Sequence, residues 1–338
     1  MNLKLLGHSG LRVSELALGT MTFGEDWGWG ASLDESRRIF DAYVAAGGNF
    51  IDTAVNYTNG SSERFVGELV APDRDKFVVA TKYTLRRTLD ASDPNAGGNH
   101  RKNMMLSVET SLRQMKTDYI DLLYLHIWDD TTPVEEVMRG LDDLVRSGKV
   151  HYVGISDTPA WVISKANMLA ELRGWSRFVS MQLPYSLVRR DAERELLPMA
   201  QSEGLSVTTW GILGGGVLTG KYRHKDATKR YPGSDERAMS AGDAVVALAE
   251  ELGKSPSQVA INWIRQRPGG AGIIPLLGAR KLAQIEDNLG ALEWSLTDEQ
   301  IARLDAVSPI ELGFPTDMLT SELVSGLIHG ETEGRLRR

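Results

Sequence analysis

Four polar residues follow stretches of apolar sequence, and their side chains suit one another chemically. Asp52 ends the short run NFID, and Tyr57 lies five residues later in a loop rich in Asn, Thr and Gly. Lys82 ends the run KFVVATK, and His126 ends the run YIDLLYLH. A phenol that donates a proton, beside an ammonium group and an imidazole that hydrogen-bond the same oxygen, is general-acid machinery for the reduction of a carbonyl group.

The charge of Lys82 is expected to adjust the acidity of Tyr57. The reference pKa of a phenol is about 10. An ammonium group about 4 Å away contributes on the order of 4 kcal/mol at an effective dielectric constant of about 20, which corresponds to roughly three pKa units. We therefore expect Lys82 to lower the pKa of Tyr57, while Asp52 keeps Lys82 charged and oriented. His126 is expected to orient the oxygen of the substrate.

Each of the four residues also has an ordinary structural explanation when it is taken alone. A lysine at a strand end is most often a solvated rim charge, a single histidine is most often a structural residue, and Asp52 alone could cap a helix. Four residues of complementary chemistry at neighbouring strand ends favour the catalytic interpretation, provided that the fold brings these ends together.

The elements that would position these residues alternate between strand and helix along the chain. Short strands rich in β-branched residues are predicted to end at Gly19, Asp52, Lys82 and His126, and others to span 150–155, 178–183, 205–210 and 271–275. Amphipathic helices are predicted at about 32–46, 62–70, 101–116, 133–148, 159–172, 190–203, 243–252, 257–267, 280–290 and 298–306. This alternation indicates a parallel sheet.

About eight strand–helix pairs with two additional helices favour a (β/α)8 TIM barrel over an open sheet. An open dinucleotide-binding sheet would need G-x-G-x-x-G after a strand, which the sequence lacks. No linker divides the chain, so we predict one domain over 1–338, with a core of about 15–308 and a C-terminal tail, 309–338, near the barrel mouth. Residues 2–6 and 11–18 predict an N-terminal β-hairpin. The ends of consecutive barrel strands face one mouth, so the four polar residues should converge there.

Four segments combine Ser or Thr with Glu or Gln three residues later, which is the pattern of a capping box at a helix start. These predicted capping boxes are Ser32–Glu35, Thr132–Glu135, Ser255–Gln258 and Thr297–Gln300.

Composition excludes several functions. The net charge is −7, which argues against nucleic acid as a partner. The chain has no cysteine, so disulfides and thiolate chemistry are excluded, and no pair of histidines has the spacing of metal ligands. A G-x-S-x-G nucleophile motif is also absent. We find no secretory signal and no apolar run long enough to span a bilayer, so no membrane partner is expected and a cytoplasmic protein is the default expectation.

Taken together, the motifs resemble the aldo-keto reductase family. The resemblance covers nearly the whole chain, from LALGTMTFG through NFIDTAVNY, VVATK and YIDLLYLH to IIPLLGARKLAQIEDNLGAL. It implies a TIM barrel that binds NADP(H) in an extended conformation and transfers hydride to a small-molecule carbonyl substrate. In this comparison Tyr57 is the acid/base, and Asp52, Lys82 and His126 complete the catalytic set.

The resemblance also implies cofactor-binding residues at the ends of the later strands. Ser156, Asp157 and Gln182 would hold the nicotinamide carboxamide, and Trp210 would stack on the nicotinamide ring. Family members usually have Asn where this chain has Asp157. A carboxylate can accept from the amide NH2 but cannot donate to the amide carbonyl.

Two further segments are expected to hold the phosphates. Gly211, Leu213, Gly215 and Lys221 belong to a Gly-rich segment whose backbone N–H groups can bind an anion. From residue 221 to residue 237 the chain has six Lys or Arg against three Asp or Glu, which favours a loop that closes over the pyrophosphate.

The second segment begins the last barrel helix. It contains Gly278, Arg280, Gln284 and Asn288. Arg280 can bind a 2′-phosphate through its guanidinium group, so NADPH is favoured over NADH. Leu276 stands where family members often carry Lys or Gly, which weakens this preference.

The sequence constrains the substrate less. Phe23, Trp27, Trp29 and Trp128 would line the mouth and suit a planar, apolar or sugar-like carbonyl compound. The tail is expected to form part of the rim, to extend as a mobile terminus or to contribute to an oligomer, and monomer and homo-oligomer both remain open. Two alternative functions are an NADP-binding regulatory or channel-type subunit with little turnover, and a barrel isomerase or lyase that uses Tyr57 and Lys82 without nicotinamide.

Overall fold

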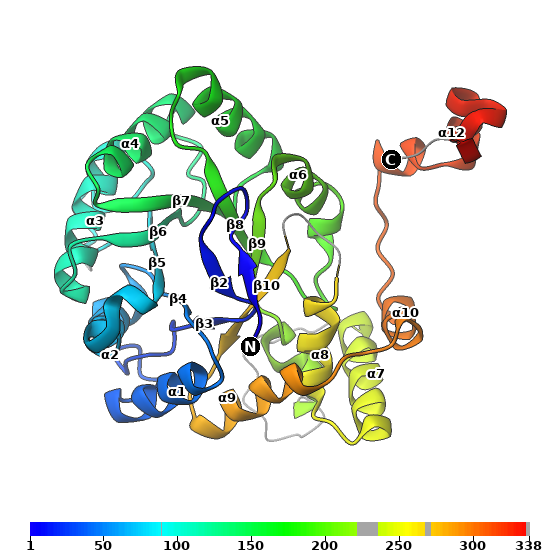
Figure 1. Ribbon diagram of the computed structural model, residues 1–338, viewed down its shortest axis with the longest axis horizontal. Helices are drawn as coiled ribbons and strands as arrows, with labels where there is room; N and C mark the ends of the chain where they lie inside the picture. Colours follow the sequence, from blue (N-terminus) through cyan, green and yellow to red (C-terminus); the bar gives the residue numbers. More distant parts are fainter. Residues whose placement is uncertain (89, 222–235, 268–271, 336–338) are drawn as a thin grey trace.

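The computed structural model describes residues 1–88, 90–221, 236–267 and 272–335. Eight parallel strands close into a barrel in the order β10-β3-β4-β5-β6-β7-β8-β9, with β10 paired to both β3 and β9 (Figure 1). The strands are β3 (Ala17–Gly19), β4 (Phe50–Asp52), β5 (Val78–Tyr83), β6 (Ile120–Leu125), β7 (Val150–Ser156), β8 (Phe178–Pro184), β9 (Ser206–Trp210) and β10 (Ile273–Gly278). The predicted (β/α)8 barrel is confirmed.

Helices surround the barrel, as the alternating sequence predicts (Figure 1). They are α1 (Leu33–Ala45), α2 (Ser61–Val70), α3 (Arg101–Met115), α4 (Val134–Arg146), α5 (Ala160–Arg173), α6 (Leu196–Glu203), α7 (Glu236–Leu252), α8 (Pro256–Arg265), α9 (Leu282–Leu289) and α10 (Asp298–Val307). The two additional helices are α7 and α10. The barrel interior is filled by a separate small core that includes Phe50, Leu122 and Tyr124.

A hairpin closes the N-terminal end of the barrel. Strands β1 (Leu3–Leu5) and β2 (Arg12–Ser14) pair antiparallel, as predicted. The Lys4 ammonium donates to the carbonyl of Ile273, and the Gly7 N–H donates to the Ser206 hydroxyl. Both acceptors are first residues of barrel strands, so the opposite, carboxyl end of the strands is left as the mouth.

The register of the strands places the predicted site residues at this mouth. Gly19 pairs with Asp52, Lys82 pairs with Tyr124, and Ser156 pairs with Gln182. His126 directly follows β6, whose last residue is Leu125.

The capping boxes are only partly as predicted. Thr297 and Gln300 form a complete box at the start of α10. Ser255 caps α8, and Gln258 bonds α9 and Trp294 instead. Ser32 likewise caps α1, but the Glu35 carboxylate accepts the N–H of Leu282. At α4 the prediction was wrong, because the Thr132 hydroxyl donates to Asp129 and the helix has no side-chain cap. At α1 and α8, the side chain that would complete the capping box instead bonds a residue far away in the sequence.

Some element bounds also differ from the prediction. The helix predicted at 190–203 begins as a short turn, η3 (Asp191–Glu193), and continues as α6. Arg190 there forms ion pairs with Glu193 and Asp305, which fixes the chain before α6. Helix α7 begins at Glu236 rather than 243, and the last strand begins at Ile273, with residue 271 outside the described residues.

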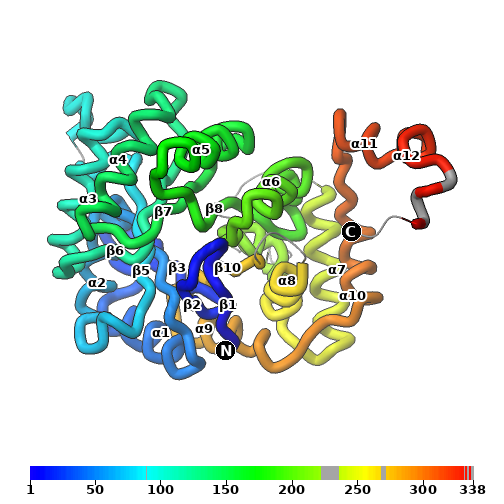
Figure 2. Tube along the Cα trace, turned by 45° about the horizontal axis from the view of Figure 1, so that its top comes forward, coloured from blue at the N-terminus to red at the C-terminus, as the bar shows by residue number. Residues whose placement is uncertain are grey.

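The C-terminal tail contains helices that the sequence did not predict. They are α11 (Thr316–Leu319), α12 (Glu322–His329) and the turn η7 (Gly330–Arg335). The tail starts near the mouth, since the Ser308 hydroxyl donates to the carbonyl of Leu187 beyond β8. From there it extends away from the barrel, and α12 stands apart from the body in both views (Figures 1 and 2).

Candidate active site

A buried ion pair holds the centre of the site. The Lys82 ammonium lies 2.6 Å from the Asp52 carboxylate and 2.8 Å from the Thr53 carbonyl, and its side chain is 0% exposed. The same ammonium lies 3.4 Å from the Tyr57 hydroxyl. The second oxygen of Asp52 accepts from the Gln182 amide at 2.9 Å. Both carboxylate oxygens are therefore used to fix neighbours, so Lys82 has one well-defined position from which it can act on Tyr57.

The backbone around Tyr57 is unusual, and it directs the phenol to the mouth. Thr58 and Asn59 adopt left-handed conformations, with φ of 44° and 53°. Such conformations are unfavourable for side chains larger than glycine. The buried Thr58 hydroxyl donates to the carbonyl of Phe23, which holds the turn in place. Tyr57 itself meets the His126 ring edge-on, with 5.8 Å between ring centroids. The four predicted catalytic residues therefore lie together.

Burial and charge set the protonation states of this group. Burial alone would lower the pKa of Lys82, but Asp52 and Tyr57 outweigh it and raise this pKa. Lys82 therefore stays charged. Burial raises the pKa of Tyr57, with Lys82 opposing and Asp52 reinforcing the rise. The expectation of a lowered Tyr57 pKa was wrong in sign because it ignored the loss of water. The consequence is a phenol that keeps its proton at neutral pH and is ready to donate it.

His126 is the neutral partner in the group. Burial, and next the charge of Lys82, lower the pKa of His126 well below its usual value. Its Nδ1 is buried and has no hydrogen-bond partner among the described residues. A neutral imidazole can still donate one hydrogen bond to a substrate oxygen without competing with Tyr57 for the proton.

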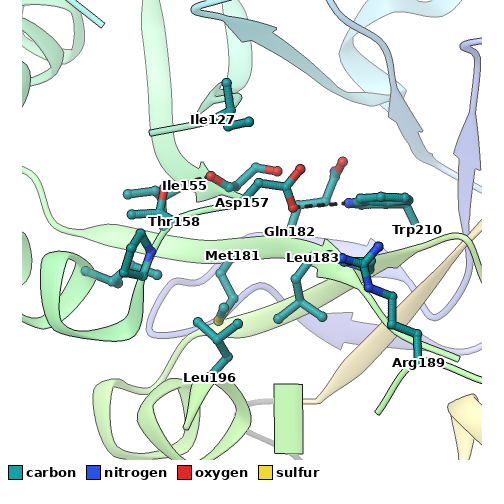
Figure 3. A pocket seen from close by; sticks show the side chains of 14 residues that line it. Ile127, Ile155, Asp157, Thr158, Met181, Gln182, Leu183, Arg189, Leu196 and Trp210 are labelled. Atoms are coloured by element: carbon teal, nitrogen blue, oxygen red, sulfur yellow. Dashed lines mark hydrogen bonds between the residues drawn. The ribbon is translucent and has the colours of Figure 1, made fainter. Parts of the chain in front are cut away.

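A cavity of about 450 Å³ opens beside the catalytic group, and the predicted carboxamide-binding residues line it (Figure 3). Ser156, Asp157, Gln182 and Trp210 all contribute to its wall. The Ser156 hydroxyl is buried without a hydrogen-bond partner in the described part of the chain. A buried hydroxyl without a partner is costly, and an amide group bound in the cavity would satisfy it. The observed residues thus fit a nicotinamide carboxamide.

Among the cavity residues that were not predicted, Arg189 is the one with a charged side chain. Arg189 follows β8, and its guanidinium carbon lies 5.7 Å from the centroid of the Trp210 ring (Figure 3). The Trp210 indole N–H donates to Asp157 at 3.4 Å. Burial raises the pKa of Asp157, while the Trp210 bond and the charge of Arg189 oppose this rise. The charge of Arg189 thus acts against the effect of burial on the Asp157 carboxyl group. The sequence signal was a second Arg beside Arg190, which looks like ordinary surface charge.

The Gly-rich segment follows β9 as predicted. Gly211 and Gly215 have φ of 70° and 63°, and the first of them has open space around its Cα. Leu213 precedes the turn η4 (Gly214–Thr219). Lys221 folds back over this turn, because a Cβ added to Gly216 would meet its side chain. The basic stretch predicted to close over the pyrophosphate falls mostly on 222–235, outside the described residues.

In the predicted phosphate-binding segment after β10, two backbone N–H groups already donate hydrogen bonds within the protein. Gly278 and Arg280 are exposed and precede α9. Gln284 lies in the first turn of α9, whereas Asn288 is buried in its last turn and not at its start, where it was predicted. The Arg280 N–H already donates to Gln284. The Leu282 N–H already donates to Glu35 at 2.6 Å. Attraction of a phosphate here would therefore come from the Arg280 side chain more than from the helix N-terminus.

Of the four aromatic residues predicted to line the mouth, two lie near Tyr57 and two pack against the core. Trp27 lies edge-on to Tyr57 at 6.4 Å between ring centroids, and Trp29 lies 5.7 Å from Trp27. Trp128 is partly buried and packs against the main core. Phe23 is 0% exposed and packs in the main core, so it is not available to a substrate. That expectation was wrong because the chain turns inward before Gly24.

Comparison with known proteins agrees with this geometry. The family described as "Aldo/keto reductase family" matches residues 15–309. A norsolorinic acid reductase of Aspergillus flavus is 39% identical over 93% of this chain and 83% of its own length. An aryl-alcohol dehydrogenase [NADP(+)] of Phanerodontia chrysosporium is 39% identical over 90% of this chain and 85% of its own length. A putative aryl-alcohol dehydrogenase of Saccharomyces cerevisiae is 37% identical over 92% and 87%, respectively.

The chain therefore belongs to the aldo/keto reductase family. It is an oxidoreductase that acts on carbonyl or alcohol groups. Within the described ranges, no helix is long and apolar enough to cross a membrane. The same ranges contain no group of three or more His, Asp or Glu that could hold a metal ion.

Proposed function

We propose that this protein reduces an aromatic aldehyde or ketone to the alcohol with NADPH, and that Tyr57 is the proton donor. The observation that carries the proposal is the buried pair of Asp52 and Lys82 beside the half-buried Tyr57, with the ammonium 2.6 Å from the carboxylate and 3.4 Å from the phenol. A phenol that keeps its proton, beside a fixed positive charge, both donates to and stabilises an oxygen that gains negative charge.

The cofactor, when bound, supplies the hydride. Ser156, Gln182 and Asp157 would hold its carboxamide, because the Ser156 hydroxyl lacks a partner among the described residues and all three line one cavity. Trp210 would support the ring. Arg280 would bind the 2′-phosphate, which favours NADPH. The relative named aryl-alcohol dehydrogenase [NADP(+)] supports this preference.

The substrate class follows from the mouth. Trp27 and Trp29 present aromatic faces and edges beside Tyr57, and aromatic side chains prefer planar aromatic partners. The names of two relatives, norsolorinic acid reductase and aryl-alcohol dehydrogenase, support an aryl carbonyl compound. His126, which is neutral, would donate to the carbonyl oxygen and align it with the Tyr57 hydroxyl.

Single-turnover loss of NADPH absorbance with an aromatic aldehyde tests the proposal. Tyr57→Phe should slow turnover by about 10²–10⁴-fold and leave the Kd for NADPH within about twofold of wild type. Tyr119→Phe is the matched control, since this phenol lies at the opposite end of β6 and bonds Asp75. NADPH binding without turnover in wild type would favour the regulatory alternative, and equal loss of binding and turnover in Tyr57→Phe would contradict the role of Tyr57.

A further inference from the structure

The C-terminal arm, residues 312–335, exposes several large apolar side chains. Phe314 is 85% exposed and Leu327 is 78% exposed. Helix α12 begins with a proper cap, because the Ser321 hydroxyl accepts the N–H of Val324. The arm is thus a formed helical element with an uncovered apolar surface, made by Phe314, Met318, Leu319, Leu323, Leu327 and Ile328.

A second uncovered apolar surface lies on α5. Trp161, Met168 and Leu172 are 66%, 57% and 76% exposed. Their spacing of seven and four residues places them on one side of the helix. The opposite side of α5, which includes Val162 and Ile163, is buried against the barrel. Helix α5 is therefore apolar on both sides, and its exposed apolar side can be buried by association with another protein surface.

The arm is held away from its own barrel. Its base is fixed, because Arg194 donates to the Glu311 carbonyl at 2.9 Å and Arg190 donates to the Ser308 carbonyl at 3.0 Å. Beyond this anchor the chain runs outward, and α11 and α12 lie clear of α5 in both views (Figures 1 and 2). An arm fixed at its base and extended from the body is the geometry of an element that docks on another molecule.

The charges around the two surfaces are complementary. From 312 to 335 the arm carries four acidic residues, Asp317, Glu322, Glu331 and Glu333, against one basic residue, Arg335. The exposed residues of α5 include two basic residues, Lys165 and Arg173, and one acidic residue, Glu171, which pairs with Arg177. Lys165 forms a long ion pair with Glu135 at 3.9 Å, in which both side chains are more than half exposed. An acidic apolar arm therefore fits a basic apolar helix face.

We propose that two copies of this chain form a two-fold symmetric dimer in which the arm of each protomer docks on α5 of its partner. Each contact joins nine large apolar side chains, six on the arm and three on α5. With two contacts related by symmetry, the interface joins eighteen large apolar side chains. Symmetry doubles the contact and leaves no arm unpaired.

Light scattering of the full-length protein gives the first test. Wild type should have twice the mass of one chain at micromolar concentration. Leu323→Asp with Leu327→Asp, and separately Met168→Asp with Leu172→Asp, should yield monomers whose circular dichroism and NADPH affinity match wild type, because all four positions are exposed. Leu106→Asp on α3, also exposed, is the matched control and should remain dimeric. A monomeric wild type, or arm variants that remain dimeric, would overturn the proposal.

Charge reversal tests the pairing of the two surfaces. Asp317→Lys with Glu322→Lys on one chain, and Lys165→Glu with Arg173→Glu on another, should each weaken self-association. A mixture of the two should form heterodimers in which one of the two contacts has both of its surfaces reversed. If each variant alone self-associates less than wild type and the mixture also fails to associate, the charges of the arm do not pair with those of α5, and this pairing is overturned.

Cross-linking distinguishes an arm that docks on α5 of the partner from an arm that folds back onto α5 of its own chain. The chain has no cysteine, so an introduced pair is unique. Leu323→Cys and Leu172→Cys, made on separate chains and mixed, should give a cross-linked dimer with a flexible bismaleimide. Leu323→Cys mixed with Leu106→Cys should not. Cross-linking confined to one chain in the doubly substituted Leu172→Cys, Leu323→Cys protein would show the fold-back and refute the exchange.

Discussion

A buried carboxyl group beneath the active site gives a prediction with a defined magnitude. Glu63 lies on α2, is 0% exposed, and accepts a short hydrogen bond from the Thr81 hydroxyl, next to Lys82 in the chain. Burial raises the pKa of Glu63 from 4.5 to about 7, although hydrogen bonds and the charge of Lys82 oppose the rise. The folded protein therefore holds a proton on Glu63 at pH values where the unfolded chain has lost it.

The sign of the effect on stability follows from this difference. Below about pH 4.5 both states carry the proton, and Glu63 adds no pH dependence. Between about pH 4.5 and 7 only the unfolded chain ionises, so the free energy of unfolding falls as pH rises, and the loss is complete above about pH 7. A difference of about 2.5 pKa units corresponds to about 3 kcal/mol, of which roughly 2.5 kcal/mol falls between pH 5 and 8.

Replacement by glutamine removes the ionisation and retains a carbonyl acceptor for Thr81. We expect the stability of Glu63→Gln relative to wild type to increase by about 2–3 kcal/mol from pH 5 to pH 8. Urea denaturation of both proteins across this range, followed by circular dichroism, measures the change. Glu68→Gln on the same helix is the control, since the Glu68 side chain is 55% exposed in its pair with Arg37. A stability difference that is equal at pH 5 and pH 8 would refute a protonated Glu63.

Three further predictions concern the cofactor-binding residues and the histidine that orients the substrate oxygen. Arg280→Ala should raise the Kd for NADPH by about ten- to a hundredfold, as expected for a hydrogen-bonded charge, with NADH little changed; equal losses for both would place Arg280 away from the phosphate. Arg189→Met should weaken cofactor binding several-fold in wild type and much less after Asp157→Asn, because Asn carries no charge to balance; fluorescence titration measures both. His126→Gln should lower kcat with little effect on the Kd for NADPH, and a loss confined to that Kd would contradict its role at the substrate oxygen.

Much of the site could be predicted because it depends on strand ends. Asp52, Lys82 and His126 each follow a short apolar run, and a parallel barrel necessarily brings these ends to one mouth. The position of Tyr57 could be predicted for the same reason, since a short loop tethers it to Asp52. The order of strands followed from the alternation of elements, which is a local property of the sequence.

The protonation state of the site could not be predicted in this way. The expected decrease in the Tyr57 pKa considered the pair with Lys82 alone, whereas burial has the larger effect and reverses the sign. Burial depends on all the elements that close around a group, and no pairwise spacing in the sequence contains that information. The same reason applies to Glu63, which reads as an exposed residue of an amphipathic helix and is completely buried.

The amino-acid sequence by itself determined the barrel, the mouth and the chemical types of the residues that meet there, because hydrophobic period and strand-end position are local patterns. Only the tertiary structure decided which partner each polar group chose. The Glu35 carboxylate accepts the N–H of Leu282 instead of completing its capping box, Arg189 lies over the ring of Trp210, and the arm after Glu311 extends outward (Figures 1 and 2). These choices depend on distances between residues far apart in the chain, which are fixed only when the whole barrel has closed.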